Sequence, residues 1–534
     1  MKKLETLGVM IDMSRNAVMS IDGMRRLVPL LAKMGYNCIL LYTEDTYEVN
    51  DEPYFGYMRG RYSKEEMKEL DALAASYGIE VIPCIQTLAH LSTITRWNKY
   101  EMDTIDILMA DEDRTYELVD RMFATLNECF STRRLHVGMD EAHDLGRGKH
   151  LDKYGYETVD AIMKRHLARI IEIANKYDYE LMIWSDMFFR PWNDGVYSIP
   201  KTTVPKEYVD ALPKTVIPVY WDYYSKDEQN YSDMMENHKQ LSKECWFAGG
   251  VWTWGGFLPH NQFTLDTMRP GLTAARKQGI KHAFMTMWGD NGAECSRFAA
   301  LPGLFYVAQY AKGVTDEAKI KAKFKSMFGI SFDDFMLIDS PNDFAPGETN
   351  PKCPKNPAKY MLYNDYFLGH FDRTVADGGK EHFAECERKL LSVAKKSRKY
   401  GYLFDNAAKL SAVLKNKYDI GIKTRKAYKA GDKAELLRLA NEEYVEISKA
   451  LTAFAKSFER QWMLENKPYG FEVQDARIGG LMKRTDSCRR RLIDYANGKI
   501  DRIPELEEEI LSFIEDNKSV YNNLYKNNFT SNVM

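Results

Sequence analysis

Two adjacent carboxylates in the sequence could carry acid–base chemistry. The segment HVGMDEAHD (136–144) begins as an apolar run and reaches Asp140 and Glu141. Neighbouring residues of a strand point to opposite faces, so both side chains reach one site only where the strand gives way to a loop. Two such carboxylates can do different work, one holding a proton and the other a negative charge. An isolated Asp-Glu pair is as often a helix cap or half of a salt bridge, so the surrounding residues decide.

Other reactive side chains also stand at the ends of short apolar runs. They are Asp12, Arg15, Glu44, Asp45, Gln86, His90, Trp184, Asp186, Tyr220, Asp222, Trp252, Trp254, Trp288, Asp290 and Glu294. Carboxylates accept hydrogen bonds from hydroxyl groups, and indole rings cover the apolar C–H face of a pyranose. The set therefore predicts a sugar-binding site.

The elements that must position these residues alternate along the chain. Eight apolar runs cover residues 8–12, 37–44, 80–86, 135–141, 181–186, 216–222, 247–252 and 282–288. Segments with helical spacing lie between them at 20–34, 63–77, 115–130, 158–177, 227–243 and 267–277. Continuous hydrophobicity is typical of parallel strands buried on both faces. Eight strand–helix units predict a (β/α)₈ TIM barrel over residues 1–314, with its reacting groups at the carboxyl ends of the strands.

The chain changes character after this barrel. A stretch dense in Pro and Asn (340–360) is followed by long helical patterns at 382–400, 406–427, 433–466, 476–496 and 504–526. Residues 315–534 are therefore predicted to form an α-helical C-terminal domain. Its many Lys, Arg and Glu residues are best explained as solvated helix faces.

Composition excludes several other classes of protein. The 534 residues are 45% hydrophobic and 13% aromatic, far from a disordered composition. Because 74 basic residues balance 77 acidic ones, for a net charge of −3, no nucleic-acid partner is expected, and no run is long enough to span a membrane. The N-terminus lacks a signal sequence and the eight cysteines form no CxxC motif, which predicts reduced thiols and a cytoplasmic location.

The carboxylate motif resembles a known family. The pattern His-x-Gly-x-Asp-Glu is similar to the end of the fourth barrel strand in glycoside hydrolase family 20, the β-N-acetylhexosaminidases, and the resemblance covers roughly the first 310 residues. It implies that Glu141 is the general acid and that Asp140 orients the substrate's 2-acetamido group. The acetamido oxygen, rather than a protein carboxylate, then attacks the anomeric carbon, giving an oxazolinium intermediate and retained configuration. Asp140 must stay ionised, whereas Glu141 must keep a proton, which requires burial or a nearby negative charge.

The resemblance assigns roles to further rim residues. Arg15 would grip the 3- and 4-hydroxyls, and His90, which ends the segment IPCIQTLAH, would pair with the general acid. Leu88 and Ala89 replace the Pro-Gly of that family motif. The sequence LYTED differs from the family's second-strand pattern, so either Glu44, which is favoured, or Asp45 backs the histidine.

The remaining assignments concern the sugar pocket. Tyr220 would donate to the acetamide oxygen and Asp222 would contact sugar hydroxyls, while three tryptophans, Trp184, Trp252 and Trp288, would form the pocket walls. Trp254 is a further candidate, because Gly255 and Gly256 after it predict an exposed loop. Either Asp290 or Glu294 would hold the 4- and 6-hydroxyls.

These observations predict an exo-β-N-acetylhexosaminidase acting on terminal β-linked GlcNAc or GalNAc. A glycosidase with a carboxylate nucleophile and a glycan-binding barrel without catalysis remain as alternatives. No cofactor is expected, and no metal, because His143 and Asp144 lack a third ligand at suitable spacing. The helical domain is a candidate homodimer surface. Within it, residues 462–484 are either a simple helix–helix turn or a segment that packs over the rim through Asn466, Lys467 or Arg477.

Overall fold

The computed structural model describes residues 4–344, 353–513 and 520–534. By its internal contacts the chain forms two compact units. The first comprises Met1–Val251, Thr264–Met287 and Phe305–Thr315, and the second comprises Trp252–Phe263, Trp288–Leu304 and Asp316–Met534. The segments that follow the seventh and eighth strands therefore belong to the second unit. The domain boundary predicted at residues 314 and 315 stays a prediction.

The first unit is built on a closed barrel of parallel strands in sequence order. The strands are β1 (Thr6–Asp12), β2 (Cys38–Tyr42), β3 (Glu80–Cys84), β4 (Arg134–His136), β5 (Glu180–Trp184), β6 (Val216–Trp221), β7 (Trp246–Gly250) and β8 (His282–Met287). Pairing of β1 with β8, from Thr6 opposite His282 to Ile11 opposite Met287, closes the barrel. The eight predicted runs and the (β/α)₈ fold are confirmed.

Helices follow the strands, and they include all six that the apolar spacing predicts. They are α1 (Ile21–Met34), α2 (Lys64–Ala75), α3 (Ser92–Thr95), α4 (Asp113–Cys129), α5 (Lys149–Tyr154), α6 (Val159–Asn175), α7 (Lys206–Ala211), α8 (Glu228–Leu241), α9 (Asn261–Gln278) and α10 (Leu301–Ala311), with short 3₁₀ turns η1 (Asp186–Phe188), η2 (Arg190–Trp192) and η3 (Arg297–Ala300). The Ser63 side chain accepts from Glu66 N and the Glu66 carboxylate from Ser63 N, a capping box that fixes the start of α2.

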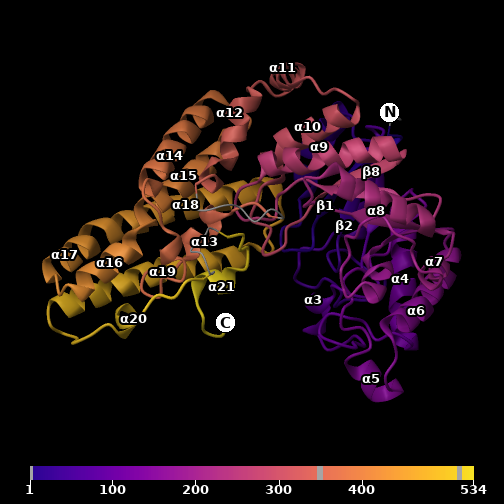
Figure 1. Ribbon diagram of the computed structural model, residues 1–534, viewed down its shortest axis with the longest axis horizontal. Helices are drawn as coiled ribbons and strands as arrows, with labels where there is room; N and C mark the ends of the chain where they lie inside the picture. The colour runs from indigo at the N-terminus through magenta and orange to yellow at the C-terminus, as the bar shows by residue number, and fades with distance from the viewer. Residues whose placement is uncertain (1–3, 345–352, 514–519) are drawn as a thin grey trace. The chain divides into compact units, whose positions relative to one another are not determined.

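The second unit is helical beyond its two strand-end segments. Its helices are α11 (Glu317–Phe328), α12 (Phe332–Met336), α13 (Pro357–Tyr363), α14 (Gly379–Lys396), α15 (Gly401–Lys417), α16 (Ile420–Lys429), α17 (Lys433–Arg438), α18 (Tyr444–Glu465), α19 (Phe471–Ala496), α20 (Pro504–Glu507) and α21 (Tyr525–Phe529), with 3₁₀ turns η4 (Leu337–Asn342) and η5 (Asp372–Thr374) and a π-helical turn η6 (Leu439–Glu443). Helix α15 packs between α14 and α18, and α18 packs on α19 (Figure 1).

Three predicted helices of this unit differ in the structure. The 406–427 pattern is divided between α15 and α16, and the 433–466 pattern includes the η6 turn. The 504–526 pattern is not a continuous helix: only Pro504–Glu507 and the segment from Tyr525 are helical, and residues 514–519 lie outside the described part.

Two further features concern the cysteines and the hydrophobicity of the helices. Seven of the eight cysteines are buried, and Cys353 is partly exposed. Among the helices of the described residues, none has both the length and the apolar character needed to cross a bilayer.

Candidate active site

A network of polar side chains links the ends of the first four strands. The Arg15 guanidinium lies 3.0 Å from the Glu44 carboxylate, which also accepts a 3.0 Å hydrogen bond from the Tyr42 hydroxyl. The Gln86 amide donates to Tyr42 Oη at 3.0 Å and to Asp140 Oδ1 at 2.7 Å. The structure thus places four strand ends on one continuous hydrogen-bonded network that reaches the predicted catalytic pair.

His90 is the charged centre of this network. Its Nε2 atom lies 3.3 Å from Asp140 Oδ2 and 3.8 Å from Glu141 Oε2. Burial lowers the pKa of His90, but the charge and hydrogen bond of Asp140, together with the charge of Glu44, outweigh it and raise the pKa to about 9. The imidazole is therefore protonated at neutral pH, and its nearer partner is Asp140 rather than the predicted Glu141.

Asp140 has the surroundings of a permanently ionised group. Burial by itself raises its pKa, but the charge and hydrogen bond of His90 and the amide of Gln86 hold the pKa below the usual value. An ionised Asp140 is the state that an acetamide-orienting role requires.

Glu141 differs sharply from its neighbour. Its side chain is 43% exposed, and the Arg190 guanidinium lies 3.7 Å from Oε1. The two basic groups nearest its carboxylate are thus Arg190 and His90. The backbone N–H of Glu141 donates to Asp186 Oδ2 at 3.1 Å. The burial expected for this residue is absent, because its side chain points from a loop rather than from the strand.

Several site residues adopt left-handed backbone angles. The φ angles are 47° at Glu44, 57° at His90 and 51° at Glu141. Such angles are strained for residues with a Cβ atom, and they concentrate at functional sites. They turn the chain sharply in the loops after β2, β3 and β4, so successive side chains there do not alternate between two faces as they do in a strand.

The structure separates the two acidic residues after β2. Asp45 is paired with Arg59, 3.2 Å away, whereas Glu44 is paired with Arg15. Burial raises the pKa of Glu44, and the charges of Arg15 and then His90 oppose that rise. Glu44 is therefore the acidic residue whose charge reaches His90, although no hydrogen bond joins the two.

Tyr220 and Asp222 are brought together at the end of β6. The Tyr220 hydroxyl donates to Asp222 Oδ2 at 3.2 Å, and Asp222 Oδ1 accepts from the backbone of Tyr224 at 2.8 Å and of Ser225 at 3.2 Å. Tyr220 is buried, with 1% of its surface exposed. Its hydroxyl is thus held in a fixed direction by the neighbouring carboxylate.

The predicted tryptophan walls have less open surface than expected. Trp184 packs against His136, with ring centroids 4.4 Å apart, and is buried. Trp252 and Trp254 are also buried and stack at 4.1 Å, while Trp288 is partly exposed.

The exposed loop predicted after Trp254 is wrong. Gly255 and Gly256 are buried, because the Asn356 side chain donates to Gly255 O at 2.6 Å and Lys359 packs against Gly256. The sequence offered no signal that α13 covers this loop.

Asp290 and Glu294 have very different surroundings in the second unit. Glu294 is buried, with Lys359 Nζ 2.6 Å from Oε2 and Arg477 Nη1 3.1 Å from Oε1. Asp290 is exposed and accepts from the Asn523 amide at 3.2 Å. A carboxylate with a salt bridge to each oxygen has little capacity left for hydroxyl groups, so Asp290 is the better placed of the two to meet a ligand.

The turn within residues 462–484 joins α18 to α19 and packs on the segment after β8. Arg477 Nη1 donates to Asn291 O at 3.0 Å as well as binding Glu294. The Gln474 amide donates to Gly292 O at 3.0 Å. Asn466 is buried, and Lys467 O accepts from the Trp462 indole at 2.9 Å. Arg477 therefore supports this segment through Glu294, and its direct contact with a sugar stays a prediction.

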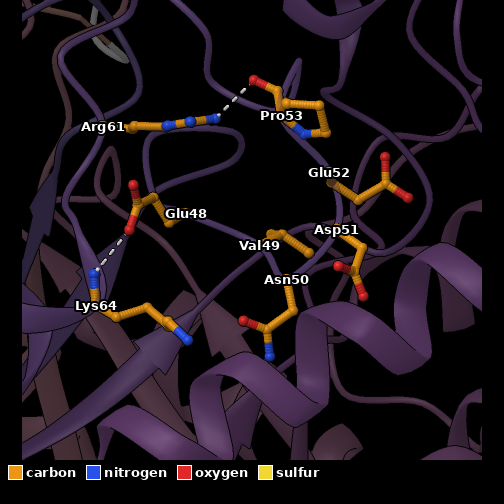
Figure 2. Close-up of a pocket in the computed structure, with 8 residues that line it drawn as sticks. All are labelled: Glu48, Val49, Asn50, Asp51, Glu52, Pro53, Arg61 and Lys64. Carbon is orange, nitrogen blue, oxygen red and sulfur yellow. Dashed lines mark hydrogen bonds between the residues drawn. The ribbon is translucent and has the colours of Figure 1, made fainter.

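Two other features could hold a small ligand. Single donor atoms of His90, Asp140 and Glu141 lie within 4.8 Å of one another, a spacing that a metal ion could use. A pocket of about 210 Å³ lies at the loop between β2 and α2. Figure 2 shows its lining residues, among which Lys64 N donates to the Glu48 carboxylate and Arg61 donates to Pro53 O. Its lining contains none of the predicted site residues and comprises Glu48, Val49, Asn50, Asp51, Glu52, Pro53, Arg61 and Lys64.

Sequence reasoning assigned no role to four residues of the first unit's network. Gln86 and Asp186 follow apolar runs and therefore belong to the predicted sugar-binding set, but nothing in the sequence gave either one a particular role. Tyr42 ends β2 among apolar residues, and Arg190 lies beyond η1, so neither carries a distinguishing pattern.

Comparison with known proteins identifies the family of the chain. Residues 7–237 match the model described as "Glycosyl hydrolase family 20, catalytic domain", and residues 333–525 match "Glycoside Hydrolase 20C C-terminal domain". The barrel and its strand-end carboxylates are thus those of the glycoside hydrolase class. The chain belongs to glycoside hydrolase family 20.

Similar proteins include two mammalian ones. The chain is 26% identical over 248 residues to Hexosaminidase D of Bos taurus, covering 42% of this chain and 64% of that protein. It is 25% identical over 220 residues to Hexosaminidase D of Homo sapiens, covering 39% and 43%. The match thus spans less than two thirds of either relative. A family 20 exo-β-N-acetylglucosaminidase of Vibrio harveyi aligns with a TM-score of 0.47 at 14% identity, covering 63% of this chain and 58% of that one.

Proposed function

We propose that the protein is an exo-acting β-N-acetylhexosaminidase that removes terminal β-linked GlcNAc or GalNAc from an oligosaccharide. The observation that carries this proposal is the contrast within the pair at the end of β4. Asp140 is buried and kept ionised by His90, whereas the adjacent Glu141 is 43% exposed. One carboxylate is thus fixed as a charge, and the other is free to exchange a proton with a substrate.

In the first step the substrate supplies its own nucleophile. The acetamido carbonyl oxygen forms a bond to the anomeric carbon, the glycosidic C–O bond breaks, and Glu141 transfers its proton to the leaving oxygen. Ionised Asp140 accepts the acetamide N–H and offsets the positive charge of the oxazolinium ion. The Tyr220 hydroxyl donates its single proton to Asp222 Oδ2 at 3.2 Å in the free protein, and it is the proposed donor to the acetamide oxygen once that proton turns from Asp222 to the bound substrate.

In the second step Glu141 acts as a base. It removes a proton from a water molecule whose oxygen bonds to the anomeric carbon, while the bond to the acetamido oxygen breaks. The free sugar leaves with its original configuration, and Glu141 is protonated again. Because Glu141 must work both as an acid and as a base, a position open to substrate and water suits it.

Charged side chains are the proposed ligands of the sugar hydroxyls. Arg15, 30% exposed and paired with Glu44, is the proposed ligand of the 3- and 4-hydroxyls. Asp290 rather than Glu294 is the proposed ligand of the 4- and 6-hydroxyls, because Lys359 and Arg477 occupy both oxygens of Glu294. Trp288, partly exposed, is the proposed wall of the acetamide pocket.

Chromogenic substrates test this proposal. Hydrolysis of β-GlcNAc or β-GalNAc aryl glycosides, no hydrolysis of β-glucosides, and inhibition by a thiazoline analogue of the intermediate are the expected results. Turnover of β-glucosides would instead indicate a protein nucleophile, and binding without turnover would indicate a glycan-binding barrel. Proton NMR of the first product formed reports whether configuration is retained.

The cytoplasmic location and the homodimer are also proposals. Seven buried cysteine thiols outside any disulfide support a reducing compartment. Sedimentation of the purified protein would test the dimer.

A further inference from the structure

Asp186 lies directly behind the proposed acid. Its side chain is fully buried at the end of β5 and accepts three contacts from other elements. Oδ2 accepts from Glu141 N at 3.1 Å and lies 3.2 Å from Arg190 Nε, and Oδ1 accepts from the Trp221 indole at 3.4 Å. One carboxylate therefore fixes both the backbone that carries the acid and the nearest guanidinium.

Arg190 connects Asp186 to the side chain of Glu141. Its Nη2 atom lies 3.7 Å from Glu141 Oε1, and its side chain is 18% exposed. It also donates to Gly195 O at 2.9 Å, and its guanidinium lies 5.8 Å from the Tyr197 ring centroid and 5.9 Å from that of Trp221. With these contacts the guanidinium is held beside the Glu141 carboxylate rather than swinging in solvent.

We propose that Asp186 and Arg190 are positioning residues that together set how firmly Glu141 holds its proton. Arg190 favours the ionised form of Glu141, which the second step needs, and Asp186 compensates that positive charge, which the first step needs. This inference rests on the proposed role of Glu141 and deepens it: beside the charged His90, whose Nε2 lies 3.8 Å from Glu141 Oε2 in the wild type and in every variant below, the pair adjusts the pH range over which Glu141 can be an acid.

The direction of the effect follows from the charges around Asp186. They are Asp140 and Glu141 after β4 and Arg190 in η2, with the Tyr197 hydroxyl on the segment before α7. Burial and then the charge of Asp140 raise the pKa of Asp186 to about 7, against the opposing charge of Arg190. Below that pH Asp186 is neutral and does not offset the positive charge of Arg190. Above it Asp186 is ionised, and its negative charge helps Glu141 to retain a proton.

Two substitutions should therefore move the pH profile in opposite directions. Asp186→Asn keeps an oxygen that can accept from Glu141 N but leaves Arg190 uncompensated, so the basic limb of kcat/KM should fall by about 1 pH unit. Arg190→Gln removes the cation, so the same limb should rise by about 1 pH unit. The basic limb of the double variant should lie close to that of the wild type. Arg190→Lys keeps the positive charge, so its basic limb should also lie close to that of the wild type.

A matched control separates charge from folding. Asp144→Asn removes an exposed carboxylate from the same loop and should leave the limb unchanged. Thermal unfolding of every variant identifies any that fails to fold, in which case Arg190→Lys and the double variant carry the test. Shifts in the same direction, or no shift in folded Asp186→Asn and Arg190→Gln, overturn the inference.

A second measurement does not depend on turnover. The carboxyl carbon of Glu141, labelled with ¹³C and assigned by comparison with Glu141→Gln, reports its ionisation in each variant by NMR. Opposite shifts of its titration without hydrolysis of any hexosaminide would uphold the inference and reject the proposed function. Hydrolysis of a hexosaminide without opposite shifts would support the proposed function and reject the inference about Asp186 and Arg190.

Discussion

Glu141 and Glu294 both follow a barrel strand, but their surroundings are opposite. Glu141, after β4, is 43% exposed, and its basic neighbours are 3.7 and 3.8 Å away. Glu294, after β8, is buried, with Lys359 at 2.6 Å and Arg477 at 3.1 Å. A carboxyl group open to solvent can exchange a proton with a ligand, whereas a buried one with an ion pair at each oxygen is bound to its partners. Strand-end position alone therefore does not predict which of these two surroundings a carboxylate has.

The largest expected effect is on catalysis at Glu141. Glu141→Gln should lower kcat by about 10² to 10⁴, because an amide cannot donate the proton that the leaving oxygen needs. Its unfolding temperature should stay close to wild type, since the side chain is half-exposed. Steady-state kinetics with an aryl β-GlcNAc substrate and calorimetry check both parts. A nearly fully active variant contradicts the assignment.

The matching change at Glu294 should act on stability. Glu294→Gln leaves the buried Lys359 without its ion pair, which should cost about 3–5 kcal/mol in the free energy of unfolding. Urea denaturation measures the loss, and a double variant, Glu294→Leu with Lys359→Met, should recover much of it. If Glu294→Gln raises KM strongly and keeps full stability, Glu294 binds the substrate and is not a structural residue in contrast to Glu141.

A smaller effect is expected at Asp290. Asp290→Asn removes a charged hydrogen-bond acceptor and should raise KM by about 10-fold, the value of one such bond to a hydroxyl group. The ratio of GlcNAc to GalNAc turnover should change as well, because these sugars differ at the 4-hydroxyl. Asp377→Asn, an exposed carboxylate of the same unit, serves as the control. An unchanged KM and ratio would remove Asp290 from the sugar site.

His90 should give stability a dependence on pH. Its pKa is raised from 6.5 to about 9 in the folded protein, so its contribution is fully present below pH 6.5 and is lost as pH rises through about 9. His90→Asn should flatten the fall of the unfolding free energy over that interval. The exposed His143→Asn variant should keep the wild-type slope, and equal slopes in all three proteins would contradict the charge on His90.

The smallest expected effect is that of a chelator. At neutral pH a protonated His90 has no lone pair for a metal ion, and metal binding would have to displace that proton. EDTA should therefore leave the rate of hydrolysis unchanged. Loss of activity on chelation, with recovery on adding Zn²⁺, would give the His90, Asp140 and Glu141 cluster a different purpose.

The barrel could be predicted well because its signal is local. Each strand is a continuous apolar run, and eight such runs with helices between them allow few other folds. The positions of Asp140, Glu141 and Tyr220 after their strands could be predicted, because the apolar runs locate the strand ends, and their catalytic roles stay predictions. Relations across the fold were not: nothing local indicates that Lys359 and Arg477 take up Glu294, or that α13 covers Gly255. Long-range ion pairs and the burial of Trp252 and Trp254 depend on packing between distant segments.

The left-handed backbone at Glu44, His90 and Glu141 has a consequence for how this protein could adapt to heat. Each such residue costs on the order of 1–3 kcal/mol, which glycine or asparagine would largely avoid. A search for heat-resistant variants scored on folding alone would therefore accumulate substitutions at these three positions and lose the enzyme's chemistry. Thermal adaptation that preserves function has to find its gains elsewhere in the chain.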